Sequence, residues 1–289
     1  MFRANGRSLA GARDDKHVKT RPFKIGKVTI GGQRPVFILG PCVIESEKFV
    51  WRMAREIAKI CRAEDVDLIF KASYNKANRT SVKSFRGMGA REGCEILAAI
   101  RDELKIPVTT DVHSPDEAKL AGGMIDLLQI PAFLCRQTDL LKAASQTGRA
   151  MNVKKGQFLA PWDVKNIADK LVAFGCNKFC FTERGTTFGY NNLVADMRSL
   201  VWIREAGYPV IFDATHSVQR PGGAGDKTSG DGALAPVLAR AATAAGCDGI
   251  FMEVHEDPPR ALSDAANQVP LKNLPKQLRM LKAIHAAVS

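Results

Sequence analysis

Eight short apolar runs recur along the 289-residue chain, and nearly every one ends in a polar or charged residue. The runs are residues 36–39 before Gly-Pro-Cys42, 67–70 before Lys71, 108–110 before Asp111, 127–130 with Gln129 inside, 151–153 before Lys154, 179–182 before Glu183 and Arg184, 210–212 before Asp213, and 249–252 before Glu253. Short bounded apolar runs are typical of buried parallel strands. Helical stretches lie between them, so the pattern predicts an α/β fold, a (β/α)8 TIM barrel.

The stretches between the runs predict eight helices. They are expected at residues 46–64, 89–104, from 114 onward, and at 137–147, 161–174, 193–206, 233–245 and 274–287. Ser46 and Ser114 are suitable N-caps, and Pro115 suits the first turn of its helix. Residues 23–35 predict a β-hairpin, with its turn at Gly31-Gly32, that covers the bottom of the barrel or packs beside it. A single barrel domain is therefore expected over residues 23–289.

The carboxyl ends of barrel strands meet at one mouth, so chemistry scattered through the sequence is expected to gather in one site. Two long connections, residues 71–88 and 219–232, also follow strands and lie on the mouth side. Long connections inside a compact domain are usually functional or disordered. The second contains five glycines and predicts a mobile lid.

The first long connection carries the strongest local motif in the chain. Its candidate anion-binding residues are Lys71, Ser73, Lys76, Asn78, Arg79, Thr80 and Ser81. Ammonium groups supply point charges for phosphate or carboxylate, guanidinium supplies a planar fork, and hydroxyls complete the oxygen shell. The alternative is a solvated basic loop, which the position of Lys71 at a strand end disfavours.

Two more cations follow neighbouring strands. Lys154 ends the fifth run and Arg184 follows the sixth, so the two are expected to hold one phosphate between them. Lys155 is expected to point the other way, because successive residues of a strand face opposite sides. Either cation taken alone could be a surface charge.

Cys42, His216 and Glu253 follow three adjacent strands, and Asp264 lies in the loop after the last one. Thiolate, imidazole and carboxylates suit a borderline divalent ion such as Zn²⁺, Fe²⁺, Mn²⁺ or Co²⁺. The alternative is a buried cysteine beside an unrelated histidine, and His216 could also relay a proton. His113 and His255 are further candidates at the mouth.

Composition narrows the class of ligand. The net charge is +12, and residues 1–22 carry six basic and two acidic side chains, so this tail, predicted to be disordered, contributes +4 and the rest +8. Nucleic-acid binding would need a basic stripe with interleaved aromatics, whereas the candidate cations stand at strand ends, so small anions are favoured. No apolar run approaches the roughly 18 residues of a membrane span, no secretory signal is present, and the seven cysteines form no CxxC pair. A cytoplasmic protein without membrane or nucleic-acid partners is expected.

These residues resemble 3-deoxy-D-manno-octulosonate 8-phosphate synthases, the aldolase-like enzymes of lipopolysaccharide precursor synthesis. The matching segments are residues 40–46, 71–86, 110–113, 129–139, 152–158, 184–185 with 188–191, 212–216, 252–255 and 262–265, which together span almost all of residues 23–289. The resemblance implies condensation of phosphoenolpyruvate with arabinose 5-phosphate, with loss of phosphate. It also implies a homotetramer, because in the family the 76–81 loop meets the mouth of a neighbouring subunit.

The resemblance implies roles for individual residues. Phosphoenolpyruvate would be held by Lys71, Lys76, Gln129, Lys154 and Arg184, and the sugar phosphate by Asn78, Arg79 and Ser81, with Thr80 near them. Asp111 and Arg136 would also stand at the mouth. Metal-independent members of the family have Asn at the position of Cys42, so this chain resembles the metal-dependent branch, with Cys42, His216, Glu253 and Asp264 as ligands.

The nearest alternative is the related 3-deoxy-arabino-heptulosonate 7-phosphate synthase, which uses erythrose 4-phosphate. Its phosphate loop resembles Lys-Pro-Arg-Thr-Ser, whereas this chain has Asn78 inserted before Arg79. The inserted residue favours the longer pentose phosphate. A basic protein that binds nucleic acid through residues 1–22 is a second alternative of a different class.

Overall fold

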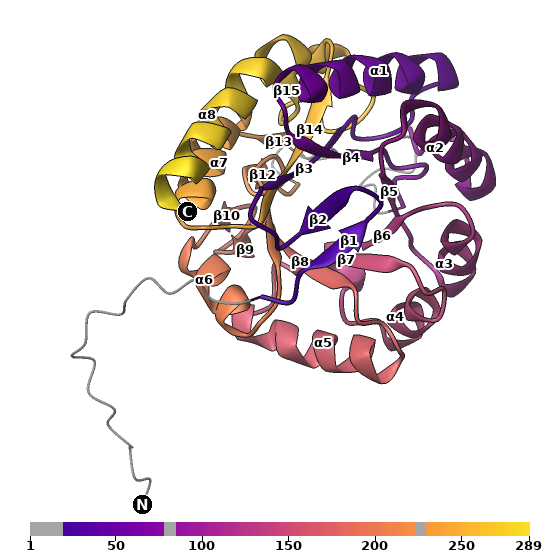
Figure 1. The fold of residues 1–289 in the computed structure, drawn as a ribbon, viewed down its shortest axis with the longest axis vertical. Coiled ribbons are helices and arrows are strands. Elements are labelled where there is room, and N and C mark those ends of the chain that lie inside the picture. Colours follow the sequence, from indigo (N-terminus) through magenta and orange to yellow (C-terminus); the bar gives the residue numbers. More distant parts are fainter. Residues whose placement is uncertain (1–19, 78–84, 223–228) are drawn as a thin grey trace, which may run out of the picture.

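The computed structural model describes residues 20–77, 85–222 and 229–289, and within them eight parallel strands close into a barrel (Figure 1). The barrel strands, in spatial order, are β3 (Val36–Gly40), β4 (Asp67–Lys71), β5 (Val108–Asp111), β6 (Leu127–Ile130), β7 (Ala150–Lys154), β8 (Phe179–Glu183), β11 (Val210–Asp213) and β14 (Gly249–His255). Pairing of β14 with both β11 and β3 closes the ring. The predicted (β/α)8 fold and all eight predicted strands are confirmed.

The helices alternate with these strands and form the outer layer (Figure 1). They are α1 (Glu47–Ala63), α2 (Ala90–Leu104), α3 (Pro115–Gly122), α4 (Thr138–Ser145), α5 (Val164–Ala173), α6 (Arg198–Glu205), α7 (Ala235–Ala244) and α8 (Leu274–Val288). The side chains of Ser46 and Ser114 accept hydrogen bonds from the backbone N–H groups of Phe49 and Glu117, so both predicted N-caps are confirmed. No helix in the described part of the chain is long and apolar enough to cross a membrane.

Short elements connect the barrel units. Two-residue strands pair as β9 (Thr186–Thr187) with β10 (Leu193–Val194) and as β12 (Gln219–Arg220) with β13 (Ser229–Gly230), and β15 (Val269–Pro270) extends β14. The prediction of a helix from residue 193 was therefore wrong, because residues 193–194 pair with 186–187 and α6 begins only at Arg198. Within residues 219–232, the segment predicted to be a lid, β12 pairs with β13. Residues 223–228 of this segment lie outside the described residues.

An N-terminal hairpin covers the bottom of the barrel (Figure 1). Its strands are β1 (Phe23–Ile25) and β2 (Val28–Ile30), and their apolar side chains join one cluster with Val36, Ile38 and Phe251 of the barrel interior. The hairpin was predicted, but its turn is at Gly26-Lys27 and not at Gly31-Gly32, because Ile25 pairs with Val28. Gly26 has φ +57°, a backbone conformation that glycine adopts at no steric cost.

The predicted disordered tail lies almost wholly outside the described residues, which begin at Thr20. The last residues of that stretch are attached to the barrel: the backbone N–H of Arg21 donates to the carbonyl oxygen of Gly207 at 3.0 Å. Arg21, which the prediction assigned to the tail, is therefore joined to the barrel.

Candidate functional site

The mouth of the barrel brings together most of the predicted site residues. Glu253, at the end of β14, is buried and receives three positively charged or ionisable groups. The Nζ atom of Lys71 donates to its Oε1 at 3.1 Å, the Nζ of Lys76 lies at 3.6 Å, and the Nε2 of His216 at 3.5 Å. Residues that are 37 to 182 positions apart in sequence from Glu253 thus converge on one carboxylate, as the fold predicts.

Largely buried cations surround the Glu253 carboxylate and balance its negative charge. Burial alone would raise the pKa of Glu253, but His216, Lys71 and Lys76 outweigh it and hold the pKa well below its usual value. Burial likewise opposes the charge on Lys76, yet the negative groups around it raise the pKa of its ammonium well above the usual value. The Glu253 carboxylate and the Lys76 ammonium therefore stay charged at neutral pH.

A close approach of two strands sets the position of Lys71. A Cβ atom at Gly40, the last residue of β3, would lie 1.9 Å from the carbonyl oxygen of Lys71 at the end of β4. Only glycine leaves room for that carbonyl. The Nζ of Lys71 in turn donates to the carbonyl oxygen of Cys42 at 3.0 Å, which holds the ammonium over the mouth.

Three of the four predicted metal ligands have donor atoms within 4.8 Å of one another: Cys42, Glu253 and Asp264. The fourth, His216, has its Nε2 3.8 Å from Asp264 Oδ2. Burial, together with the charges of Asp264 and Glu253, raises the pKa of the Cys42 thiol well above its usual value. A divalent cation would reverse that effect, because a coordinated thiol is deprotonated. The donor set therefore fits a borderline divalent ion.

Asp213, at the end of β11, joins the metal candidates to the anion candidates. Its Oδ2 accepts a hydrogen bond from Lys154 Nζ at 2.7 Å and lies 2.8 Å from His216 Nδ1, an ion-pair contact whose alignment falls short of a hydrogen bond. Its Oδ1 accepts the backbone N–H of His216 at 2.9 Å. No role for Asp213 was predicted, although it follows its strand as Asp111 does.

Arg184 is buried beside this group, and its guanidinium is only partly paired. Its Nη2 donates to Gln219 Oε1 at 2.7 Å, whereas its buried Nη1 has no hydrogen-bond partner among the described residues. Burial lowers the pKa of Arg184, against the charges of Asp213 and Glu183. A buried donor without a partner is costly, so this atom is available to an anionic ligand.

Four side chains at the base of the mouth are linked by hydrogen bonds. Asn152 donates to Gln129 Oε1 at 3.0 Å, Gln129 donates to Asp111 Oδ1 at 2.7 Å, and the hydroxyl of Ser73 donates to Asp111 Oδ2 at 2.6 Å. Burial would raise the pKa of Asp111, but Lys71 and other cations hold it well below its usual value. Gln129 and Asp111 therefore act as one hydrogen-bonded unit, and Asn152 is a member that was not predicted.

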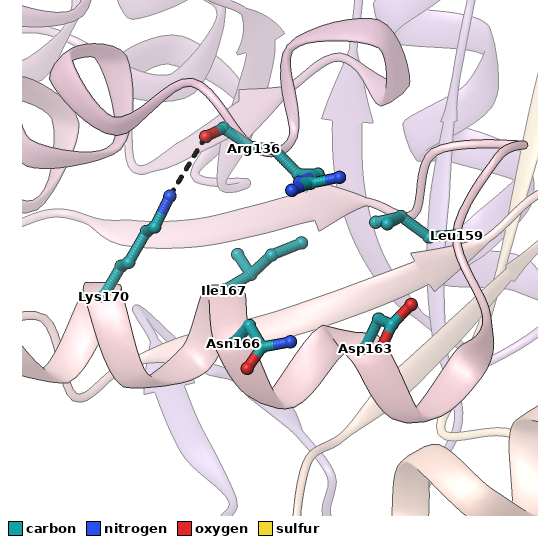
Figure 2. A pocket seen from close by; sticks show the side chains of 6 residues that line it. All are labelled: Arg136, Leu159, Asp163, Asn166, Ile167 and Lys170. Atoms are coloured by element: carbon teal, nitrogen blue, oxygen red, sulfur yellow. Dashed lines mark hydrogen bonds between the residues drawn. The ribbon is translucent and has the colours of Figure 1, made fainter.

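Arg136 is not brought into this group. It lies after β6 and is exposed, and its backbone oxygen accepts a hydrogen bond from Lys170 Nζ at 3.2 Å. With Asp163 and Ile167 it lines a separate cavity of about 250 Å³ against α5, into which its guanidinium points (Figure 2). The predicted residues Asn78, Arg79, Thr80 and Ser81 lie outside the described residues.

The two other candidate histidines are engaged elsewhere. His255 Nδ1 accepts the backbone N–H of Asp257 at 2.9 Å, and its Nε2 lies 3.3 Å from Glu45 Oε1. His113 Nδ1 lies 2.9 Å from Glu117 Oε2, which also accepts the hydroxyl of the buried Tyr74. Neither histidine belongs to the Cys42 group.

Glu117 supports a prediction about acid stability. Burial opposes its charge, but hydrogen bonds from His113 and Tyr74 prevail and lower its pKa to about 2. Its stabilising effect is therefore fully present above the unfolded pKa of about 4.5 and is lost as pH falls toward 2. We expect Glu117→Gln to lower the free energy of unfolding by about 2–3 kcal/mol at pH 7 and by less at pH 3. Urea unfolding at both pH values measures this.

The exposed Glu95 provides the matched control for this measurement, since its side chain is 59% exposed. Glu95→Gln should change the stability little at either pH. An equal loss at pH 3 and pH 7 in Glu117→Gln would contradict the linkage.

Comparison with known proteins places the chain among related sequences. Residues 13–289 match the model of the family described as "DAHP synthetase I family". Proteins named "2-dehydro-3-deoxyphosphooctonate aldolase" are similar over 93% of this chain and 99% of their own length. That of Geobacter sulfurreducens is 56% identical over 270 residues, that of Pelobacter propionicus 56% over 270, and that of Citrifermentans bemidjiense 55% over 271.

Proposed function

Because the chain belongs to the DAHP synthetase I family, we infer from the residues at the mouth and from the names of its relatives that it is a 2-dehydro-3-deoxyphosphooctonate aldolase. The enzyme joins phosphoenolpyruvate, arabinose 5-phosphate and water into 3-deoxy-D-manno-octulosonate 8-phosphate and inorganic phosphate. It is a carbon–carbon bond-forming transferase. The observation that carries this inference is the convergence of Lys71, Lys76, Lys154 and Arg184 on one mouth.

We propose that phosphoenolpyruvate lies over these cations. Its phosphate suits Lys154 and Arg184, because the buried Nη1 of Arg184 lacks a hydrogen-bond partner within the described ranges and an anion would satisfy it. Its carboxylate suits Lys71 and Lys76 with the amide of Gln129. Phe251 lies beneath the ammonium of Lys154, 3.9 Å from the ring centroid, and limits how far that group can move.

The charges at the mouth nearly cancel before a substrate enters. The four cations are opposed by the carboxylates of Asp111, Asp213, Glu253 and Asp264. Binding of two phosphorylated substrates therefore adds uncompensated negative charge. This balance supports the proposal that a divalent ion belongs to the site, with Cys42, His216, Glu253 and Asp264 as the residues that would hold it.

The bond-forming step follows from this placement. The methylene carbon of phosphoenolpyruvate attacks the aldehyde carbon of the sugar, and the aldehyde oxygen takes up the proton that water releases as it adds to the neighbouring carbon, where positive charge develops. The bond from that carbon to the phosphate oxygen then breaks, the phosphate leaves with the bonding electrons, and the added hydroxyl gives up its proton to form the ketone. Lys154 and Arg184 hold the phosphate through the step, and Asp213 keeps the Lys154 ammonium oriented. A divalent ion bound at Cys42 would supply a positive charge that polarises the aldehyde or the water.

We also propose a homotetramer. Four aromatic side chains on the loops after β6, β7 and β8 are exposed: Phe133, Phe158, Phe188 and Tyr190. Tyr190 is 99% exposed, which is unusual for an aromatic side chain unless another surface covers it. Sedimentation equilibrium measures the assembly, and a monomer at micromolar concentration would overturn this proposal.

Phosphate release from phosphoenolpyruvate tests the function. We expect release with arabinose 5-phosphate and far less with erythrose 4-phosphate. Exhaustive chelation should abolish it, and one or more of Zn²⁺, Fe²⁺, Mn²⁺ and Co²⁺ should restore it. A preference for erythrose 4-phosphate would overturn the substrate assignment, whereas activity untouched by chelation would overturn the metal alone.

A further inference from the structure

A second pair of charged side chains, Lys155 and Glu183, is buried behind Lys154 and Arg184; we call it the hidden pair. Lys155 follows Lys154 along the chain, and Glu183 precedes Arg184. Because successive residues of a strand point to opposite sides, Lys155 and Glu183 face away from the lumen, whereas Lys154 and Arg184 face the mouth. Lys155 is 0% exposed and Glu183 1%. The Lys155 Nζ lies 3.5 Å from Glu183 Oε2, an ion-pair contact without hydrogen-bond alignment.

Each member of this pair holds backbone that shapes the mouth. Lys155 Nζ donates to the carbonyl oxygen of Leu159 at 3.0 Å and lies 3.3 Å from the oxygens of Gly156 and Thr186. It thereby joins the loop after β7 to strand β9. Glu183 Oε1 accepts the backbone N–H groups of Arg184 at 3.0 Å and Gly185 at 2.7 Å.

The two hydrogen bonds accepted by Glu183 Oε1 fix the turn from which the Arg184 side chain projects. Gly185 has φ +91°, so the chain turns sharply there, and the Glu183 carboxylate bonds the N–H groups on both sides of Arg184 Cα. β7 and β8 are hydrogen-bonded neighbours, with Lys154 opposite Thr182. A change at the hidden pair is therefore transmitted to both phosphate-facing cations at once.

Stability alone does not account for the pair. Burying two charges carries a desolvation cost that apolar side chains of similar size would avoid, so a buried ion pair is weak evidence of a stabilising role. Resting on the proposed function, we propose that Lys155 and Glu183 are positioning residues that hold Lys154 and Arg184 at the spacing required by the phosphate of phosphoenolpyruvate.

The test measures binding of phosphoenolpyruvate by calorimetric titration in the absence of the sugar phosphate, together with the thermal midpoint of unfolding. We expect Lys155→Met and Glu183→Gln each to raise the Kd about tenfold and to lower the midpoint. In the double variant no unpaired charge remains, so the midpoint should recover while the Kd stays raised. Glu183→Gln keeps an oxygen for the Arg184 and Gly185 N–H groups but loses the attraction of Lys155, so its rise in Kd measures how far the ion pair holds that oxygen in place.

Lys165→Met is the matched control, because Lys165 pairs with Asp169 on the exposed face of α5. Its Kd should equal that of the unchanged protein, and an equal rise there would overturn the proposal. So would a double variant whose Kd recovers with its midpoint, since a merely structural pair would restore both. If the single variants do not fold, the double variant decides. Failure of the unchanged protein to bind phosphoenolpyruvate would overturn the proposed function, and this inference with it.

Discussion

Replacing Arg184 with glutamine is expected to lower kcat/KM for phosphoenolpyruvate by about 10²- to 10³-fold. Its guanidinium is buried, and its Nη1, which has no partner among the residues that the structure describes, is the donor that the substrate phosphate would satisfy. The amide of glutamine can replace a hydrogen bond but not the charge. Steady-state phosphate release at saturating arabinose 5-phosphate measures the change.

Arg198→Gln is the control for this substitution, since Arg198 is exposed and bonds only to Asp196 among the side chains of the described residues. It should leave kcat/KM within about twofold of the unchanged protein. A fall of less than about threefold in Arg184→Gln would remove Arg184 from the phosphate site.

Replacing Cys42 with asparagine is expected to weaken divalent-ion binding by more than about 100-fold. The substitution removes the sulfur donor from a group in which the donor atoms of Glu253 and Asp264 lie within 4.8 Å of it. Metal content per chain after equilibration with a graded chelator gives this affinity without any assay of activity.

The buried Cys94 provides the control for loss of a thiol, because it lies on the buried face of α2 in the core cluster outside the barrel. Cys94→Ala should retain the full metal content at a modest cost in stability. Metal content in Cys42→Asn equal to that of the unchanged protein would exclude Cys42 as a ligand.

The barrel could be predicted because its strands carry two signals at once: a short apolar run, and a polar residue where the run ends. The short hairpin β9–β10 carries neither signal. Leu193 and Val194 were assigned to the start of the helix that follows them. Their pairing with Thr186 and Thr187 depends on the course of the loop between them. Two-residue strands are set by such tertiary pairing and leave no periodic pattern.

Site residues could be predicted from the sequence where a charged residue directly follows an apolar run that forms a strand. Asp213 meets that criterion, yet nothing in the sequence points to its partner, because Lys154 is 59 positions away. Lys155 illustrates the reverse. Its outward direction follows from strand alternation and is confirmed by its contacts with Leu159 and Thr186, but alternation could not predict that the outer side is buried.

The hairpin β1–β2 determines from which end of the barrel small molecules can reach the site. Its apolar side chains join Val36, Ile38 and Phe251 in one buried cluster inside the barrel, so among the described residues the end opposite the mouth is closed by apolar side chains. Ligands therefore reach the Lys71 and Lys154 ammonium groups from the mouth and not from the hairpin end. The two phosphorylated substrates and the two products therefore share one route. A molecule bound at the rim of the mouth blocks the release of a molecule bound deeper in the site.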